Sequence, residues 1–127
     1  MGIQNDFIHA ELRVADYYQR GGWKLLKHQY RCIGSELDLI VIKKRMLVVV
    51  EVKLRKKWLG FSSEIEDVLG YRKYQALYRG LQHFLANAQV DYQSCRIDLA
   101  VVKAGYSEKM KRERARFDDL IIYQDVR

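Results

Sequence analysis

The chain has 127 residues, of which 49% are hydrophobic and 12% aromatic, so it can bury one core and is not intrinsically disordered. Lys and Arg outnumber Asp and Glu by 23 to 16, and the resulting net charge of +7 favours a polyanionic partner, nucleic acid before an anionic membrane surface. No apolar run reaches the ~20 residues of a transmembrane helix, and residues 1–10 lack the features of a secretory signal, so we expect a cytoplasmic protein without membrane contact.

The first half of the chain predicts one helix and three strands. Apolar periodicity favours a helix over residues 5–20, ended by Gly21-Gly22. Its predicted apolar stripe contains the acidic Glu11 and is formed by Phe7, Ile8, Leu12, Val14, Ala15 and Tyr18. Residues 24–32, 37–42 and 46–55 read as strands, and the short turns between them predict antiparallel neighbours. The apolar run 47–50 is typical of a strand buried on both faces.

The second half predicts a helix followed by two strands. Ser63 and Glu66 have the spacing of a capping box, so we expect a helix over 64–88, with a break at Gly70 left open and Lys73 on its apolar face. A strand over 96–102 follows, and the long helical connection predicts a parallel crossover. A basic segment 103–116 and a strand over 120–123 end the chain. We predict a single α/β domain over 1–127, a central mixed sheet flanked by helices in the order α-β-β-β-α-β-β.

Two short motifs about a dozen residues apart carry the chemistry, Gly34-Ser35-Glu36-Leu37-Asp38 and Val50-Glu51-Val52-Lys53. Side chains alternate along a strand, so Glu51 and Lys53 share one face. If Lys44-Arg45 is the turn between the two strands, Asp38 lies directly opposite Glu51, with side chains roughly 5 Å apart. Two carboxylates that close repel each other, and a bound cation relieves the repulsion. The pattern therefore predicts a site for a hard divalent cation with a lysine beside it.

These motifs resemble the Asp…Glu-x-Lys signature of the PD-(D/E)XK nuclease superfamily. Within it, the chain is similar to the small bacterial YraN-like family of predicted endonucleases, over roughly residues 9 to 102. The residues that carry the resemblance are Ala10-Glu11, Gly21-Gly22, Tyr30-Arg31, Gly34-x-Glu36-Leu37-Asp38-Leu39-Ile40, Val50-Glu51-Val52-Lys53-x-Arg55, Lys73 and Arg96-Ile97-Asp98. The chain departs from the family in having Ala10 and Ser35 where glycines are usual, and no proline ahead of Lys73.

The resemblance implies a restriction-endonuclease-like core that hydrolyses nucleic-acid phosphodiester bonds with Mg²⁺ or Mn²⁺. It implies that Asp38, Glu51 and the main-chain carbonyl of Val52 hold the ion. Lys53 would position or help to deprotonate the attacking water and counter the charge on the phosphate. Glu11 would orient a second ion or a water, as a first-helix glutamate does in the similar Holliday-junction resolvases.

The expected partner is nucleic acid, DNA before RNA, and branched DNA is one candidate substrate. A homodimer stays open. The side chains expected to contact nucleic acid are Lys73, Arg55, Lys111 and Arg112. The basic run around Lys111 has two interpretations that stay open, a phosphate-binding arm and a solvated segment.

Other polar side chains favour structural roles. Glu36 is either an auxiliary ligand or an exposed carboxylate, and Arg96 and Asp98 are expected to pair on one strand face. The histidines His9, His28 and His83 lack zinc spacing, so surface or packing roles are expected. Cys32 and Cys95 are expected to be reduced packing residues. The tyrosines Tyr71, Tyr74 and Tyr78 could stack on bases, but helix packing is the favoured interpretation.

The sequence thus predicts a metal-dependent endonuclease. Two alternatives remain at this stage, a nucleic-acid-binding module that does not cleave and an assembly factor that retains a nuclease-like site. Cleavage assays on branched, flap, duplex and single-stranded DNA, with Glu51→Gln beside the wild type, would separate the three.

Overall fold

The elements follow the predicted order. The computed structural model describes residues 3–55, 70–103 and 120–126. Within these ranges lie helix α1 (Ile3–Arg20), strands β1 (Lys24–Cys32), β2 (Ser35–Lys43) and β3 (Met46–Arg55), helix α3 (Tyr71–Asn87), and strands β4 (Ser94–Lys103) and β5 (Leu120–Tyr123). The chain is a single α/β domain, as predicted. The predicted helix before residue 70 and the basic residues 104–119, with Lys111 and Arg112, lie outside the described residues.

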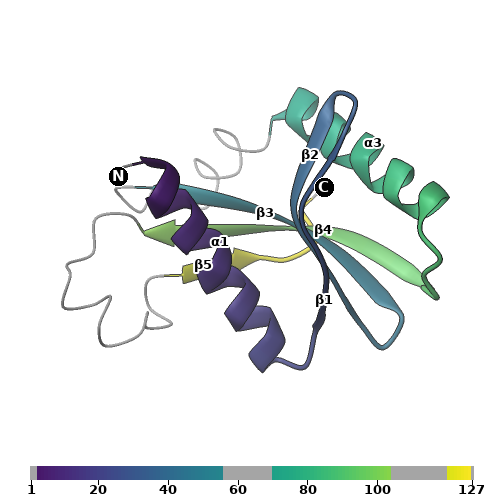
Figure 1. Cartoon of the computed structure of the whole chain (residues 1–127), viewed down its shortest axis with the longest axis horizontal. Helices are drawn as coiled ribbons and strands as arrows, with labels where there is room; N and C mark the ends of the chain where they lie inside the picture. The colour runs from purple at the N-terminus through teal and green to yellow at the C-terminus, as the bar shows by residue number, and fades with distance from the viewer. Residues whose placement is uncertain (1–2, 56–69, 104–119, 127) are drawn as a thin grey trace.

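The five strands form one mixed sheet in the order β1-β2-β3-β4-β5 (Figure 1). Strands β1, β2 and β3 are antiparallel neighbours, β3 and β4 are parallel, and β5 is antiparallel to β4. Parallel neighbours require a long connection, and the chain between β3 and β4 includes α3. The predicted antiparallel hairpins and parallel crossover are confirmed.

The turn between β2 and β3 fixes their register. Lys44 and Arg45 have φ of 49° and 65°, the left-handed conformation of a two-residue hairpin turn whose twist matches that of the strands. Pairing runs from Lys43 with Met46 to Leu39 with Val50, as the two-residue turn predicts. The pairing ends there, and Asp38 and Glu51, which were predicted to lie directly opposite each other, are the next residues of the two strands. In Figure 1 the β1-β2 hairpin crosses steeply over the β3-β4 pair, which shows the strong twist of the sheet at this point.

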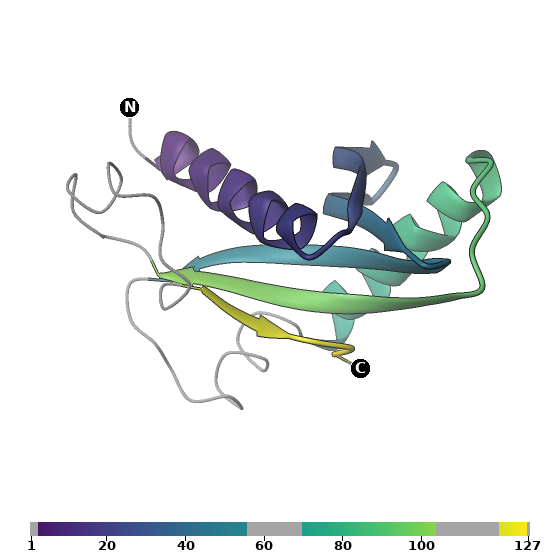
Figure 2. The same ribbon diagram turned by 90° about the horizontal axis from the view of Figure 1, so that it is seen from below.

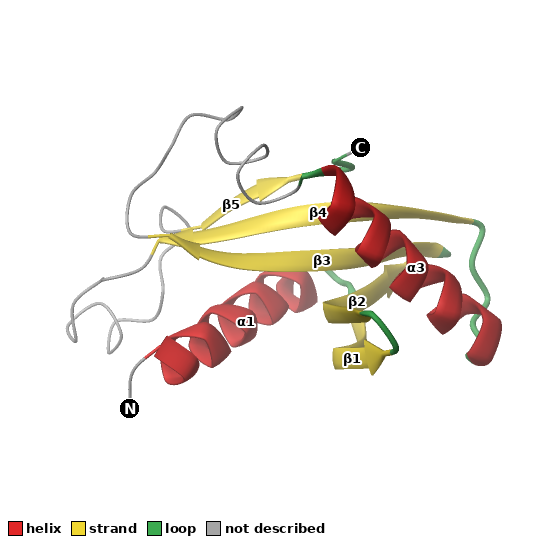
Figure 3. Cartoon of the chain, turned by 90° about the horizontal axis from the view of Figure 1, so that it is seen from above, coloured by secondary structure: helices red, strands yellow, loops and turns green. Residues whose placement is uncertain are grey.

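Among the described residues, helices α1 and α3 cover opposite faces of the sheet (Figures 2 and 3). Helix α1 packs on the side chains that point to one face of β2, β3 and β4, including Leu39, Val41, Val48, Val50 and Ala100. Helix α3 packs on the other face, where the buried side chains include Leu47, Val49, Leu99 and Val101. Because both faces are covered, β3 is buried from Leu47 to Val52, as the apolar run predicted. No helix in the described ranges is long and apolar enough to cross a membrane.

Helix α3 approaches β2 closely at Gly80. A Cβ atom there would lie 2.5 Å from the Ser35 Oγ and 2.9 Å from the Leu37 Cδ2. The Ser35 hydroxyl also donates a hydrogen bond of 2.7 Å to the carbonyl of Ala76. Glycine at this position therefore lets the helix lie against the start of β2, with its N-terminal turn near the carboxylate motifs.

The predicted stripe of α1 is partly wrong. Ile8 and Leu12 are 42% and 54% exposed, whereas Val14 and Tyr18 are buried with Glu11 between them. At 100° per residue, Ile8 and Leu12 lie at the edge of this buried arc, so the predicted stripe was too wide. Apolar residues at a stripe's edge are common on protein surfaces, and pattern alone does not separate them from core positions.

A buried polar network ties α1, β4 and the C-terminal residues together. The Arg96 guanidinium makes bonds of 2.9 Å and 3.2 Å to the two oxygens of Asp98, which is fully buried. Asp98 also accepts hydrogen bonds from the Tyr18 hydroxyl and the Asp125 amide. Burial of the Tyr18 hydroxyl and the adjacent charge of Asp98 raise the pKa of Tyr18. The predicted structural pairing of Arg96 and Asp98 is confirmed.

Candidate active site

Asp38 is buried where the pairing of β2 with β3 ends. The last paired residues are Leu39 and Val50. Just beyond this pair, the Val52 amide donates a hydrogen bond of 2.8 Å to the Asp38 Oδ2. The carboxylate thus takes the hydrogen-bond position that a continuing β2 main chain would have filled. This bond fixes the Asp38 side chain against the edge of β3.

The Val52 main chain faces the same edge. In an extended strand the N–H and C=O of one residue point to the same side, because a hydrogen-bonded pair exchanges both bonds. The Val52 N–H points to Asp38, so its carbonyl points to this edge as well. A carboxylate and a main-chain carbonyl are both ligands that hard divalent cations prefer.

Glu51 lies on the neighbouring position of β3 and contacts two lysines. It is 2% exposed. Its Oε2 is 3.0 Å from the Lys73 Nζ and 3.8 Å from the Lys53 Nζ. The Lys73 contact is an ion pair without hydrogen-bond direction, and the buried Oε2 has no hydrogen-bond partner within the described residues. Glu51 therefore keeps an oxygen that a cation could take.

Lys73 and Lys53 reach Glu51 from different elements. Lys53 follows it on β3 by two residues, which puts both side chains on one face as predicted. Lys73 comes from the first turn of α3, and its stem lies on the sheet-facing side that also carries Leu77 and Leu81. The sequence predicted Lys73 on the apolar face of this helix. It did not predict the contact of Lys73 with Glu51.

Burial and the closeness of other carboxylates determine the protonation of Asp38. Burial, and after it the neighbouring Glu51 carboxylate, raise the pKa of Asp38 from 3.8 to about 9, and the more remote charge of Glu11 adds to the effect. The hydrogen bond from the Val52 amide acts in the opposite direction, because it stabilises the carboxylate. Without a cation, Asp38 therefore keeps its proton at neutral pH.

Glu11 reaches the site from α1 and is held by strand β1. It is fully buried, and its Oε1 lies 2.7 Å from the His28 Nε2 and 3.1 Å from the Gln29 Nε2 that donates to it. The second oxygen, Oε2, has no hydrogen-bond partner among the described residues. The sequence predicted Glu11 on the buried stripe, and the structure adds a polar pair that holds it.

His28 and Gln29 were missed by sequence reasoning. His28 was expected in a surface or packing role, but it pairs with Leu39, next to Asp38 on β2, and contacts Glu11. Strand β1 is irregular here: its register shifts between Leu25 and Lys27, and Gln29 has a left-handed φ of 56°. These irregularities change the direction in which the side chains of this part of β1 point. The two-residue turn at Ile33-Gly34 could have given the pairing of His28, but alternation across the left-handed residue Gln29 does not give the face of its side chain.

Two further candidates lie on β2 and β3. Glu36 is exposed and lies 3.5 Å from the Arg31 Nε, so it is a surface ion pair and not part of the buried group. Arg55 is half-buried further along β3 and donates to the Leu54 carbonyl. Cys32 and Cys95 are free thiols, as expected.

The residues present fit a hard divalent cation. Within the described residues no three His, Cys, Asp or Glu side chains gather into a complete cation cage. The donors are instead Asp38, Glu51 and the Val52 carbonyl, and Mg²⁺ commonly binds through one or two carboxylates while water and substrate phosphate complete its shell. The Glu51 Oε2, which has no hydrogen-bond partner among the described residues, and the proton held on Asp38 both mark carboxyl oxygens that a cation could take.

Comparison with known proteins places the chain in a family. The sequence pattern of "Uncharacterised protein family UPF0102" matches residues 10–102, which include Glu11, Asp38, Glu51, Lys53 and Lys73. The chain belongs to UPF0102. Two UPF0102 proteins are similar over most of their length. One, from Synechococcus sp. strain JA-3-3Ab, is 34% identical over 102 residues, which cover 80% of this chain and 77% of the relative.

The other UPF0102 protein, from Saccharophagus degradans, is 35% identical over 100 residues, which cover 78% of this chain and 83% of the relative. A third, UPF0102 protein SYNW1051 from Parasynechococcus marenigrum, is 45% identical over 56 residues, which cover 44% of this chain. The family match spans the chain from Ala10 to Val102, so it includes the elements that build the site.

Proposed function

We propose that this UPF0102 protein hydrolyses phosphodiester bonds in nucleic acid, with DNA as the main substrate and Mg²⁺ or Mn²⁺ as the cofactor. The observation that carries the proposal is the buried carboxylate pair Asp38 and Glu51 at the end of a strand pairing, with Lys53 and Lys73 against it. This arrangement supports the resemblance to PD-(D/E)XK nucleases in residue type, in position on the strands and in burial.

Asp38, Glu51 and the Val52 carbonyl would hold the ion. When bound, a divalent cation lowers the pKa of its water and offsets the charge that develops on the phosphate. Asp38 has to lose its proton for this, because a protonated carboxyl is a poor ligand. The Val52 amide holds the Asp38 Oδ2 in place and leaves Oδ1 free of this bond.

Lys53 would act on the phosphate and on the attacking water. It is half-buried, close enough to Glu51 to be oriented by it at 3.8 Å, and not itself a ligand for a cation. A fixed cation near the reacting phosphate stabilises the developing charge more strongly in a partly dry site than in water. Lys73 balances Glu51 in the metal-free protein and would turn to the substrate phosphate when the ion takes over that role.

The experiment is cleavage of labelled branched, flap, duplex and single-stranded DNA with Mg²⁺ or Mn²⁺, for the wild type and Glu51→Gln. The matched control is Glu36→Gln, the same substitution at a surface carboxylate on β2. Cleavage that is lost in Glu51→Gln and kept in Glu36→Gln supports the proposal. Binding without cleavage in the wild type would instead support a binding module, and neither activity an assembly factor.

A further inference from the structure

Helix α3 carries a cluster of three tyrosines at its surface, two of which are exposed. Tyr71, Tyr74 and Tyr78, with Gln75 and Arg79, are the described residues that line a depression of about 480 Å³. Helix packing was the favoured prediction for the tyrosines, and it holds only for Tyr74, which lies against the core. It is wrong for Tyr71 and Tyr78, which are 76% and 47% exposed. Large aromatic rings at this exposure are candidates for a binding surface.

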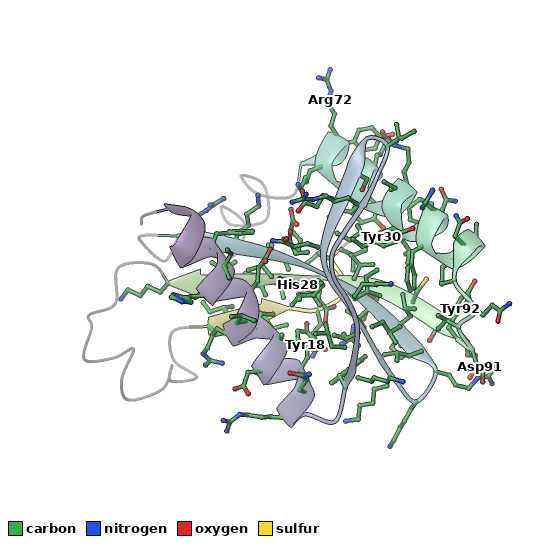
Figure 4. The ribbon with its side chains drawn as sticks, in the orientation of Figure 1. Tyr18, His28, Tyr30, Arg72, Asp91 and Tyr92 are labelled. Carbon is green, nitrogen blue, oxygen red and sulfur yellow. The ribbon has the colours of Figure 1, made fainter. Side chains whose placement is uncertain are left out.

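The surroundings of this tyrosine surface are basic. The sequence of α3 contains no Asp or Glu, and its basic residues Arg72, Lys73 and Arg79 all lie in the first half of the helix, where the tyrosines are. Figure 4 shows Arg72 projecting away from the fold at the start of α3. The Gln75 amide donates a hydrogen bond of 2.7 Å to the Tyr71 hydroxyl, which restrains that ring. Restrained aromatic rings beside arginines suit a ligand with flat apolar faces and negative charge.

The candidate active site and the tyrosine surface both lie at the first turns of α3, on different sides of the helix. The Lys73 Nζ lies 3.0 Å from the Glu51 Oε2. From Tyr71 to Tyr78 the helix rises about 10 Å, which is about three steps of stacked bases. A strand that leaves the active site along α3 could therefore pass its bases over the rings.

We propose that this tyrosine surface binds unpaired nucleotides of a substrate whose single-stranded segment adjoins the cleaved duplex. The inference rests on the proposed function, since it assigns the substrate class to the same site. Paired bases within a duplex have their faces covered by neighbours, whereas unpaired bases expose them to aromatic side chains. The tyrosines then give a preference for flapped or branched DNA over blunt duplex, and the basic residues hold the phosphates.

The test compares binding of labelled flapped and blunt duplex DNA in EDTA, by fluorescence anisotropy. Stacking on one exposed ring is worth about fivefold in affinity at the low end of measured values, so Tyr71→Ala/Tyr78→Ala should weaken flap binding roughly 25-fold. Blunt-duplex binding should stay unchanged. Tyr71→Phe/Tyr78→Phe keeps the rings and should keep the preference. Tyr92→Ala is the matched control, because Tyr92 is 40% exposed and lies beyond the far end of α3 (Figure 4).

Three results would overturn the inference. The wild type binds flapped and blunt DNA equally, the double alanine variant keeps its preference, or sedimentation shows that the double alanine variant turns a dimer into a monomer. The last result would assign the tyrosines to a contact between two copies of the chain. Failure of the proposed function looks different, since the wild type would then cleave none of the DNA substrates with Mg²⁺ or Mn²⁺.

Discussion

Binding of Mn²⁺ at neutral pH should release close to one proton, because Asp38 carries that proton in the metal-free protein. Burial and the neighbouring Glu51 raise the pKa of Asp38 to about 9, whereas an ordinary aspartate has a pKa of about 3.9. At pH 7 a group with a pKa of about 9 is protonated in about 99 molecules of 100. The ion and the proton compete for the same carboxylate.

The size of the effect follows from this competition. Below pH 9 the apparent affinity for Mn²⁺ should rise about tenfold per pH unit, or about 1.4 kcal/mol of binding free energy. The folding stability of the metal-free protein depends on pH in the opposite direction. The folded protein binds the Asp38 proton more tightly than the unfolded chain does, so the stability of the metal-free protein should fall as pH rises from about 4 toward 9.

Isothermal titration calorimetry of Mn²⁺ binding measures the proton directly. Titrations at one pH in phosphate and in Tris, whose ionisation enthalpies differ, give the number of protons released per ion. Repeating them between pH 6 and 8 gives the slope of affinity against pH. Asp38→Asn is the control, since an amide of similar shape carries no titrating proton, and it should bind Mn²⁺ more weakly and without proton release.

Zero protons released by the wild type at pH 7 would refute this reasoning, since it would mean that Asp38 is already ionised. The same number of protons in wild type and Asp38→Asn would also refute it, because the proton would then come from another group. A slope near zero between pH 6 and 8 leads to the same conclusion.

Three further substitutions test other parts of the site. Lys53→Met removes a cation that is not a ligand, so Mn²⁺ affinity should change little while cleavage slows about 10²-fold or more; equal losses in calorimetry and single-turnover assays would contradict its role. Glu11→Gln removes a charge that helps to raise the pKa of Asp38, so the pH profile of Mn²⁺ binding should move to lower pH, and an unchanged profile would exclude Glu11 from the site. Gly80→Ala places a Cβ 2.5 Å from the Ser35 Oγ and should lower the free energy of unfolding in urea by about 1–3 kcal/mol, partly restored by Ser35→Gly; a fully stable single variant would refute the close packing.

The carboxylate pair could be predicted because its geometry depends on local rules. The Lys44-Arg45 turn fixes the register of two neighbouring strands, and alternation then gives the face of the side chains over the paired stretch from Leu39 to Val50. Asp38, Glu51 and Lys53 all lie within these two strands. No information from distant parts of the chain was needed to bring them together.

The contacts of Glu11 could not be predicted in this way. Its partner His28 lies on β1, where a register shift and a left-handed residue at Gln29 change the direction of the side chains. A bulge has no reliable signal in a single sequence, so alternation cannot be carried across it. The apolar stripe of α1 predicts that this helix packs on the sheet. Which strand residue Glu11 then contacts depends on the irregularity of β1.

The tyrosines of α3 show a different limit. Tyrosine is apolar over most of its ring and polar at its hydroxyl, so it is found in cores and on surfaces alike. Leu77 and Leu81 have the four-residue spacing of a buried helix stripe, and both are buried. The same periodicity could not decide for Tyr71 and Tyr78, because they lie on the flank of the helix beside the buried stripe.

The three acidic side chains of the site are each balanced in a different way. A buried carboxylate without a partner costs several kcal/mol. Asp38 avoids this cost by keeping its proton, Glu51 by its lysine contacts, and Glu11 by its bonds to His28 and Gln29. Each carboxyl group is therefore stabilised without an ion, and an ion that binds here would have to replace these contacts.

This exchange links the ion to the nucleic acid. An ion at Asp38 and Glu51 would displace the Asp38 proton and take over the charge that Lys73 now balances. Lys73 is 42% exposed in its side chain and lies on the same helix as the tyrosine surface, so it would be released toward a phosphate there. A phosphate that binds Lys73 would in turn free Glu51 for the ion. Because such linkage is reciprocal, we expect the proposed site to bind cation and polyanion with positive coupling.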